Sequence, residues 1–460
     1  MNNANYKIAR TLRCKNANIP GTLGKLTTTI GSVGVDIGNI TTVHLGHHYT
    51  VRDIEVLLNN KRHLKNLIDE VSKIKEVIVL EVRDQVLDLH RSGKIKVVST
   101  VPITSVDVLR RVYTPGVAEV CNLILDRPSN KDTYTSIAYS VAIVTDGTAI
   151  LGLGNIGPLA GMPVMEGKSA LLQQLVGISG IPILLDTTDP DEIVEVVKHI
   201  APTFGGIHLE DIASPRCFPI QDRLENELNI PVMHDDQQGT AVVVLAALIN
   251  ACKLTNRTLE EAKIGNIGLG AAGLSIGKFL LRYTGNPTLG VAKTEASVRR
   301  HAEQGGIPSS FDEIMKTADI VIATSGVKDL IQPRMVEKGQ IIFALSNPYP
   351  EIAPELARAS GAALAVDGRT VNNLLGYPGI WRGALDALAN KFTYEMYKAA
   401  ALAIAGATTE GELVPNPLDP IAHLAVTHGV ARAAIDSSVA QRPLDDDYFE
   451  NRNITEPPWV

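Results

Sequence analysis

The chain has 460 residues, with a hydrophobic fraction of 45%, a charged fraction of 20% and a formal net charge of −7 at pH 7. This is the composition of a globular protein, because disordered chains carry far less apolar material. The mild acidity gives no reason to expect nucleic acid or an anionic membrane as a partner. Four widely spaced cysteines, no visible signal peptide and a longest central apolar run (residues 241–249) of about half a bilayer span predict a cytoplasmic protein.

Residues 1–90 form a self-contained pattern. The periodicity of apolar residues predicts, in chain order, strand 6–14, helix 23–33, strand 36–44, strand 49–59, helix 64–74 and strand 77–82. The order βαββαβ is typical of a ferredoxin-like fold, in which two helices cover one face of an antiparallel sheet. With the turn Pro20-Gly21-Thr22-Leu23-Gly24, this segment resembles an ACT domain, a regulatory module that binds amino acids or other small effectors. A ferredoxin-like dimerisation domain without a ligand is the alternative.

Beyond residue 93, apolar strands alternate with helices, which is typical of a mostly parallel sheet covered on both faces. A second unit of this kind begins near Asn256. We therefore predict an α/β protein of three parts. These are an ACT-like domain over residues 1–90, a catalytic metal-binding domain over residues 91–239 and 374–460, and a Rossmann-type dinucleotide-binding domain over residues 240–373.

Two expected strands end in adjacent carboxylates. One strand is followed by Glu210 and Asp211, and another by Asp235 and Asp236. The carboxyl edge of a parallel sheet is where α/β folds bind their ligands, and four carboxylates at one edge repel each other unless a cation lies between them. Oxygen ligands of this kind favour Mg²⁺ or Mn²⁺. Helix capping by either pair is the alternative.

Lys168 follows a glycine-rich stretch, residues 147–167, that lets the backbone approach a ligand closely. We expect Lys168 near the start of a helix over residues 169–176, where desolvation and the helix dipole favour its neutral form and suit a general base. A solvated surface lysine is the alternative. Tyr113 precedes a Pro-Gly turn, which is typical either of a hydroxyl that enters a cleft or of a core tyrosine.

The stretch Gly268-Leu269-Gly270-Ala271-Ala272-Gly273 follows an expected strand and opens an expected helix. In this context the glycines provide a tight turn, room for a pyrophosphate and close helix packing, while the helix N-terminus attracts the phosphates. The stretch therefore predicts a dinucleotide site. A simple β-turn is the alternative.

These blocks, in this order, resemble the malic enzymes of the shorter bacterial type, from about residue 93 to about residue 442. The resemblance implies oxidative decarboxylation of malate to pyruvate with a nicotinamide dinucleotide and a divalent metal. It implies that Lys168 takes the proton of the C2 hydroxyl, that Asp235 orients Lys168 and that Tyr113 protonates C3. It also implies that the metal ligands are Glu210, Asp211 and Asp236. The residues implied to bind the substrate through their amides are Asn347, Asn372 and Asn373.

Three departures from the family pattern bear on the substrate and the cofactor. Longer members carry an arginine where this chain has Ala149, and the loop at residues 367–371 is shortened. The strand at residues 288–293 has no acid for an adenosine ribose, and Lys293 fits a 2′-phosphate instead, which favours NADP slightly over NAD. The chain is expected to form a homodimer or a higher homo-oligomer. Alternatives to the malic enzyme reaction are malolactic or oxaloacetate decarboxylation without net redox, and an effector-binding protein whose catalytic half has decayed.

Overall fold

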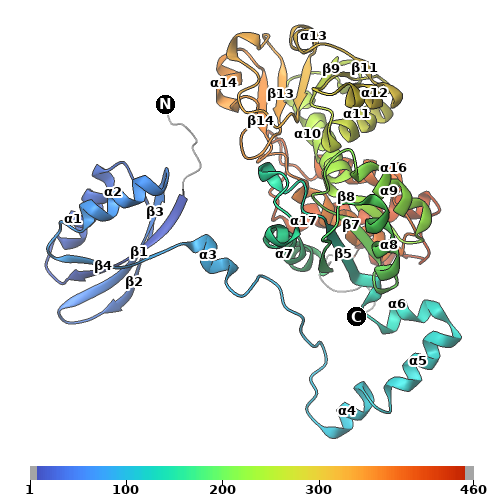
Figure 1. Ribbon diagram of the computed structural model, residues 1–460, viewed down its shortest axis with the longest axis horizontal. Helices are drawn as coiled ribbons and strands as arrows, with labels where there is room; N and C mark the ends of the chain where they lie inside the picture. Colours follow the sequence, from blue (N-terminus) through green and yellow to red (C-terminus); the bar gives the residue numbers. More distant parts are fainter. Residues whose placement is uncertain (1–7, 451–460) are drawn as a thin grey trace. The chain divides into compact units, whose positions relative to one another are not determined.

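The computed structural model describes residues 8–450 (Figure 1). The chain separates into two compact units, Met1–Lys96 and Val97–Val460. We call them the N-terminal unit and the main unit, and each is described by itself.

The N-terminal unit has the predicted element order. Its elements are β1 (Ile8–Ala17), α1 (Thr22–Ser32), β2 (Asp36–Leu45), β3 (Tyr49–Leu58), α2 (Lys61–Val71), β4 (Val77–Arg83) and a short α3 (Gln85–His90). The strands form one sheet in the order β2-β3-β1-β4, and every neighbouring pair is antiparallel. Alternate residues of β1 and β3, such as Leu12 and Ile54, are buried together with Leu26 and Leu67 of the helices. One hydrophobic layer between sheet and helices therefore holds this unit together.

The first sheet of the main unit is parallel and fully covered. It has the order β6-β5-β7-β8, with β5 (Ser140–Thr145), β6 (Ser179–Leu184), β7 (Gly206–Leu209) and β8 (Val232–His234). Residues alternate between two hydrophobic clusters, which places α7 (Pro158–Val176) on one face and α8 (Pro190–Ile200) with α9 (Cys217–Glu227) on the other. Figure 1 shows these layers. The C-terminal helices α15 (Tyr377–Asp386), α16 (Tyr394–Gly406) and α17 (Pro420–Asp436) extend the core on the α7 side.

The second sheet of the main unit has six parallel strands in the order β11-β10-β9-β12-β13-β14. This is the strand order of a Rossmann fold. Its strands are β9 (Ile264–Ile267), β10 (Leu289–Val291), β11 (Ile307–Pro308), β12 (Ile320–Ala323), β13 (Ile341–Ala344) and β14 (Leu364–Asp367). Its helices are α11 (Ala271–Thr284), α12 (Glu295–Glu303), α13 (Phe311–Thr317) and α14 (Pro354–Ala359).

Helix α10 (Thr240–Leu254) joins the two sheets and follows a π-helical turn, Asp235–Gly239. The combined helical segment Asp235–Leu254 is long and apolar enough to span a membrane by length and composition, but 72% of its most apolar stretch is buried in the protein. It packs against α16 and α11, so we assign it to the core.

Residues 97–134 carry α4 (Val106–Val112), α5 (Val117–Asp126) and α6 (Lys131–Tyr134). Every residue of this range is exposed or half-buried, and we call it the exposed segment. A final short helix, α18 (Asp446–Glu450), precedes the end of the described chain.

Candidate active site

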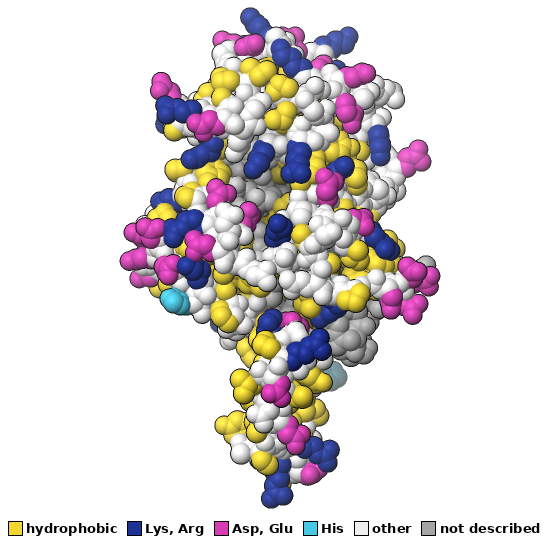
Figure 2. All heavy atoms as spheres, turned by 90° about the vertical axis from the view of Figure 1, so that its right-hand side faces the viewer, with side chains coloured by type: hydrophobic (Ala, Val, Ile, Leu, Met, Phe, Trp, Pro, Cys, Tyr) yellow, Lys and Arg dark blue, Asp and Glu magenta, His cyan; other side chains and the backbone are white. Residues whose placement is uncertain are grey.

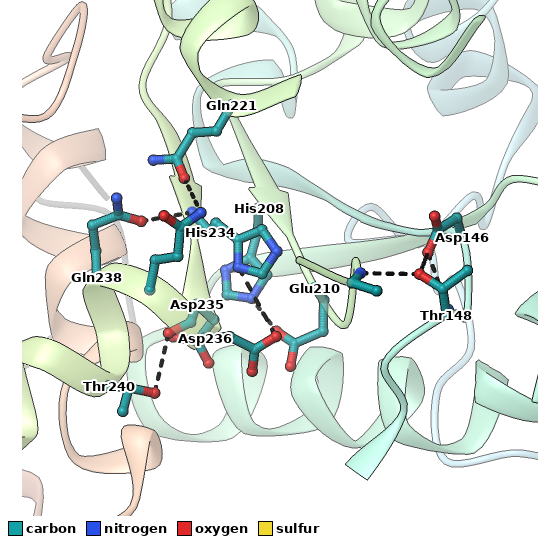
Figure 3. A network of polar contacts seen from close by, with 12 residues as sticks. Asp146, Thr148, His208, Glu210, Gln221, His234, Asp235, Asp236, Gln238 and Thr240 are labelled. Carbon is teal, nitrogen blue, oxygen red and sulfur yellow. Dashed lines mark hydrogen bonds and ion pairs between the residues drawn. The ribbon is translucent and has the colours of Figure 1, made fainter. Parts of the chain in front are cut away.

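The two predicted carboxylate pairs emerge side by side. Strands β7 and β8 are parallel neighbours with Leu209 opposite His234, so the residues that follow them leave the sheet at the same edge. Oxygen atoms of Glu210, Asp211 and Asp236 all lie within 4.8 Å of one another. Figure 3 shows Glu210 and Asp236 directed toward the same region. The structure thus brings together the three side chains that the sequence marked as metal ligands.

The backbone at Asp211 is held in an unusual conformation by the loop after β5. Asp211 has φ of 55°, a left-handed value that non-glycine residues adopt infrequently and that is often found at functional sites. The Ala149 N–H donates to its carbonyl at 2.9 Å. Two residues further on, the Ala213 N–H donates to Thr148 Oγ1 at 2.9 Å, and that hydroxyl donates to Asp146 at 2.6 Å (Figure 3). This network fixes the direction in which Asp211 presents its carboxylate.

Lys168 lies among the carboxylates. Its Nζ is 3.2 Å from Glu210 Oε1, donates to Asp235 Oδ2 and lies 4.4 Å from the centre of the Tyr377 ring. The side chain is 11% exposed, so the alternative of a solvated surface lysine is wrong. The position predicted for it in its helix is also wrong. Helix α7 begins at Pro158, which puts Lys168 in the interior of the helix, away from the N-terminal end of the dipole.

The expected charge state of Lys168 needs the same correction. Burial lowers the pKa of Lys168, but the carboxylates of Asp235 and Glu210 outweigh burial and hold the pKa well above its ordinary value. Burial and a helix dipole alone would favour a neutral amine, but the fold brings two anions into contact with it. In this structure the amine is therefore the counter-charge of the carboxylate cluster.

The carboxylates influence one another's ionisation. Burial opposes the ionisation of Glu210, but Lys168 and His208 outweigh it and lower the pKa of Glu210 to about 2. Burial and the charges of Glu210 and Asp236 raise the pKa of Asp211 to about 9. Burial and the charge of Glu210 raise the pKa of Asp236 to about 7. Asp211 therefore retains a proton near neutrality unless a cation lies within the cluster.

The donor set fits a hard divalent cation. Three carboxylates supply oxygen atoms, and Asp211 Oδ2 is buried without a hydrogen-bond partner among the described residues. Mg²⁺ and Mn²⁺ prefer such ligands and leave further positions for water or substrate. A divalent cation would satisfy the unpaired oxygen and remove the repulsion that raises the pKa of Asp211.

A cavity of about 740 Å³ lies over this cluster. Its lining includes Lys168 of α7 and the carboxylates at the edge of the first sheet, with Ala271 and Ala272 at the start of α11 and Thr324 after β12. It therefore lies between the carboxylates and the N-terminus of α11, where a small substrate and a dinucleotide can meet.

Two family descriptions match the chain. Residues 92–190 and 187–225 match the malic enzyme N-terminal domain, and residues 237–307 match the malic enzyme NAD binding domain. NAD-dependent malic enzyme 1 of Bacillus subtilis (strain 168) is 56% identical over 428 residues, which are 93% of this chain and 98% of that protein. The chain belongs to the malic enzyme family.

Other members resemble it over most of their length. The bifunctional malic/malolactic enzyme of Bacillus subtilis (strain 168) is 42% identical over 80% of this chain and 97% of that protein. The crystal structure of the malic enzyme from Pyrococcus horikoshii Ot3 superposes with a TM-score of 0.75 and 39% identity, covering 80% of this chain and 94% of that chain. The family and its α/β architecture, both expected from the sequence motifs, are thus confirmed.

The glycine turn of this malic enzyme has the geometry that a dinucleotide needs. Gly268 has φ of 96°, and a Cβ there would meet the Thr324 backbone at 2.7 Å. A Cβ on Gly273 would lie 1.9 Å from the Gly268 carbonyl oxygen, so this glycine permits the close packing of α11. A Cβ on Gly270 would point into open space, which leaves room for a phosphate beside the helix N-terminus.

The three predicted substrate-binding asparagines of this malic enzyme line the cavity. Asn347 donates to the Gly368 carbonyl at 3.3 Å, and the Asn372 carbonyl oxygen accepts from the Leu374 N–H at 2.9 Å. The Asn372 side chain therefore caps the following turn, Asn373–Leu375. Lys328 also lines the cavity, and the sequence reasoning missed it. Its position just beyond strand β12, at the carboxyl edge of the second sheet, was the signal that marks it.

Two predicted residues are absent from the cavity lining of their own chain. Tyr113 follows α4 in the exposed segment and is 68% exposed. Lys293 is exposed just beyond β10. Arg300, seven residues further on, stacks its guanidinium on the Phe218 ring at 4.4 Å. The described residues of one chain thus assemble the amine, the carboxylates, the asparagines and the glycine turn, but not Tyr113 or Lys293.

Proposed function

We propose that the chain oxidatively decarboxylates L-malate to pyruvate and CO₂ with reduction of NAD(P), at a divalent metal site. The observation that carries this proposal is the cavity in which Lys168, the carboxylate cluster and the α11 turn face one another. A steady-state assay of malate with each dinucleotide, with and without Mn²⁺, tests it. Reduced nicotinamide and pyruvate should form in equal amounts, and only when metal is present.

The residues divide the chemistry among them. A bound cation would polarise the C2 oxygen of malate, and the nicotinamide would accept the C2 hydride. Lys168 takes the C2 hydroxyl proton, and Asp235 holds and orients the amine. When a dication neutralises Glu210, Lys168 loses part of the attraction that raises its pKa, which favours the neutral base. As the C4 carboxylate leaves as CO₂, Tyr113 donates a proton to C3.

Substrate carboxylates require donors in place of the missing arginine at Ala149. Asn347 and Asn373 supply amide N–H groups, and Lys328 supplies a cation in the same cavity. Among the described residues that line the cavity, only Lys168 and Lys328 carry an ammonium group, and Lys168 is paired with the carboxylates. We therefore assign one malate carboxylate to Lys328 and the asparagines.

Malolactic conversion is the second candidate, because a relative with 42% identity is a bifunctional malic/malolactic enzyme. It keeps the same proton transfers but returns the hydride to the product. Lactate formation without net absorbance from reduced nicotinamide would favour it. Failure of NAD and NADP alike to bind would favour a regulatory protein with a decayed catalytic half.

Lys293 is proposed as the contact for a 2′-phosphate, which gives the chain use of NADP as well as NAD. Its exposed position just beyond β10 supports this, because that strand end meets the adenosine ribose in Rossmann folds. Arg300 contributes less, since its guanidinium is stacked on Phe218.

The N-terminal unit is proposed as an ACT-type domain that binds an amino acid or a related small effector. Both amide atoms of Asn16 and the hydroxyl of Thr22 are buried without a hydrogen-bond partner among the described residues. They flank the turn at Gly21, between β1 and α1, where φ is 88°. Buried polar groups are nearly always paired, so their unpaired state supports a polar ligand at this turn. Amino acids that raise the unfolding temperature or alter turnover would identify it.

The main unit is proposed to assemble into a homodimer or a higher homo-oligomer through the exposed segment. Val97, Val98 and Leu125 there are 95%, 62% and 79% exposed. Figure 2 shows yellow hydrophobic side chains over the part of the chain that carries α4 and α5. Exposed apolar patches of this kind mark interaction sites. Light scattering across a concentration series tests the assembly.

We further propose that residues 91–239 and 374–460 bind malate and metal, and that residues 240–373 bind the dinucleotide.

A further inference from the structure

A buried histidine connects the carboxylate cluster to the C-terminal helices. His208, on β7, is fully buried, and its Nε2 lies 2.6 Å from Glu210 Oε2 (Figure 3). On the other side of the ring, the Trp381 indole Nε1–H donates to His208 Nδ1 at 2.8 Å. Trp381 lies 173 residues later in the sequence, on α15, and is also fully buried.

The indole determines which nitrogen of the histidine carries the proton. An indole N–H can only donate, so His208 Nδ1 must be the acceptor and carry no hydrogen. The remaining proton is on Nε2, where it donates to the carboxylate of Glu210. In the series Trp381–His208–Glu210, each residue therefore donates a hydrogen bond to the next.

We propose that Trp381, acting through His208, is a positioning residue that orients Glu210 for the divalent cation. The inference rests on the proposed metal site. Oε2 of Glu210 is occupied by His208, while Oε1 lies 3.2 Å from Lys168 Nζ. Rotation of the carboxylate would break the first contact, so Glu210 presents one defined oxygen to the cluster. Partners that donate to a ligating group commonly alter metal affinity about 10- to 100-fold when they are removed.

The fold makes room for this arrangement. A Cβ at Gly206, two residues before His208 on β7, would lie 2.2 Å from Trp381 Cζ3, so only glycine admits the indole against the strand. Phe392 packs edge-on against the indole with ring centres 5.1 Å apart. Tyr377 meets the His208 ring edge-on at 5.7 Å. The indole is thus clamped at the position from which its N–H reaches His208.

Two variants separate the hydrogen bond from packing. Trp381→Phe keeps an aromatic ring but removes the N–H, which leaves His208 Nδ1 without its donor and the imidazole free to turn away from Glu210. Phe392→Leu disturbs the same aromatic cluster but leaves both hydrogen bonds. We expect Trp381→Phe to weaken Mn²⁺ binding about 10-fold or more, and Phe392→Leu to leave it within about 2-fold. Calorimetric titration of Mn²⁺ without substrate measures both.

His208 itself provides the rescue test. Glutamine places an N–H near the position of His208 Nε2, whereas leucine has no donor. His208→Gln should therefore retain most of the Mn²⁺ affinity, and His208→Leu should lose about 10- to 100-fold. Equal affinities of the glutamine and leucine variants would overturn the proposal.

The position of the proton on His208 can also be measured directly in the metal-free wild type. This measurement does not depend on comparing the metal affinities of variants. In protein labelled with ¹⁵N-histidine, the signal of His208 should show one protonated nitrogen, Nε2, and one bare nitrogen, Nδ1, that accepts a hydrogen bond. In Trp381→Phe the bare nitrogen should shift toward the value of an unbonded one. A protonated Nδ1 in the wild type, or Mn²⁺ affinity unchanged by Trp381→Phe, would refute the inference. Failure of the wild type to bind Mn²⁺ would instead refute the metal site.

Discussion

Asp211→Asn should stabilise the metal-free enzyme and abolish its stabilisation by metal. Oxygen atoms of Asp211 and of its neighbours Glu210 and Asp236 lie within 4.8 Å. Two unit charges at that separation repel each other by about 3.5 kcal/mol at an effective dielectric constant of about 20. Burial adds to this repulsion, and together they raise the pKa of Asp211 to about 9.

The sign of the pH dependence follows from the raised pKa. In the unfolded chain Asp211 is ionised above its ordinary pKa of 3.8, whereas in the folded metal-free enzyme it keeps its proton up to about pH 9. The folded state therefore binds one proton more, and its stability falls by about 1.4 kcal/mol for each rise of one pH unit within this window. Between about pH 6 and about pH 9 the loss is about 3.5 to 4 kcal/mol. Asparagine does not ionise, so Asp211→Asn removes this pH-dependent loss of stability.

Urea unfolding of the wild type and of Asp211→Asn, with a chelator present, measures the difference in unfolding free energy at each pH. The advantage of the variant should grow by about 3.5 kcal/mol from about pH 6 to about pH 9. Addition of Mn²⁺ at about 100 times its dissociation constant should raise the wild type by about 2.7 kcal/mol and leave the variant unchanged. Parallel pH curves for the two proteins would refute the electrostatic reasoning, and equal stabilisation by Mn²⁺ would remove Asp211 from the metal site.

Four further experiments address the other assigned residues. Lys168→Ala should lower turnover of malate by about 10²- to 10⁴-fold while metal and dinucleotide binding persist, and unaltered turnover would contradict its role as base. Because Tyr113 lies outside the cavity lining of its own chain, a mixture of inactive Lys168→Ala and Tyr113→Phe chains should regain up to about a quarter of wild-type activity in mixed dimers; complete inactivity would contradict supply of Tyr113 by a second copy. Lys293→Ala should raise KM for NADP and leave KM for NAD, and an equal change in both would remove Lys293 from the 2′-phosphate. Deletion of residues 1–96 should leave catalysis but abolish the response to amino acid effectors, and a retained response would place the effector elsewhere.

The carboxylate cluster could be predicted because strand topology determines it. An apolar strand followed directly by two acids puts those acids at a sheet edge, and two parallel neighbours share that edge. Glu210, Asp211 and Asp236 therefore converge without any contact needing to be known beforehand. The glycine turn was predictable for a similar reason, since the spacing of Gly268, Gly270 and Gly273 carries meaning only between a strand and a helix. Both predictions depended on local pattern and on one rule of topology.

Helix α7 shows where local pattern fails. Gly161, Pro163 and Gly167 argue against a helix, yet all three lie inside Pro158–Val176. A Cβ at Gly161 would lie 2.7 Å from Ile150 Cδ1, so tertiary packing favours a glycine there despite its low helix propensity. The helix start was therefore placed too late, and the dipole argument for Lys168 failed with it. The two carboxylates that raise the pKa of this amine, Glu210 and Asp235, directly follow β7 and β8. They lie 42 and 67 residues after Lys168 in the sequence.

The pairing of His208 with Trp381 could not be predicted from the sequence. In the sequence, His208 is a polar residue within an apolar strand and Trp381 is an aromatic residue in a helix, and each pattern is typical of an ordinary core position. Only the fold shows that the indole N–H ends on the imidazole, and that Gly206 is small because the indole occupies the space beside it. A buried donor that can only donate, placed against a ring with two possible tautomers, carries directional information that no spacing encodes. The candidate ligand-binding residues could thus be predicted from strand ends, whereas the residues proposed to orient them are identified only from hydrogen-bond direction in the folded core.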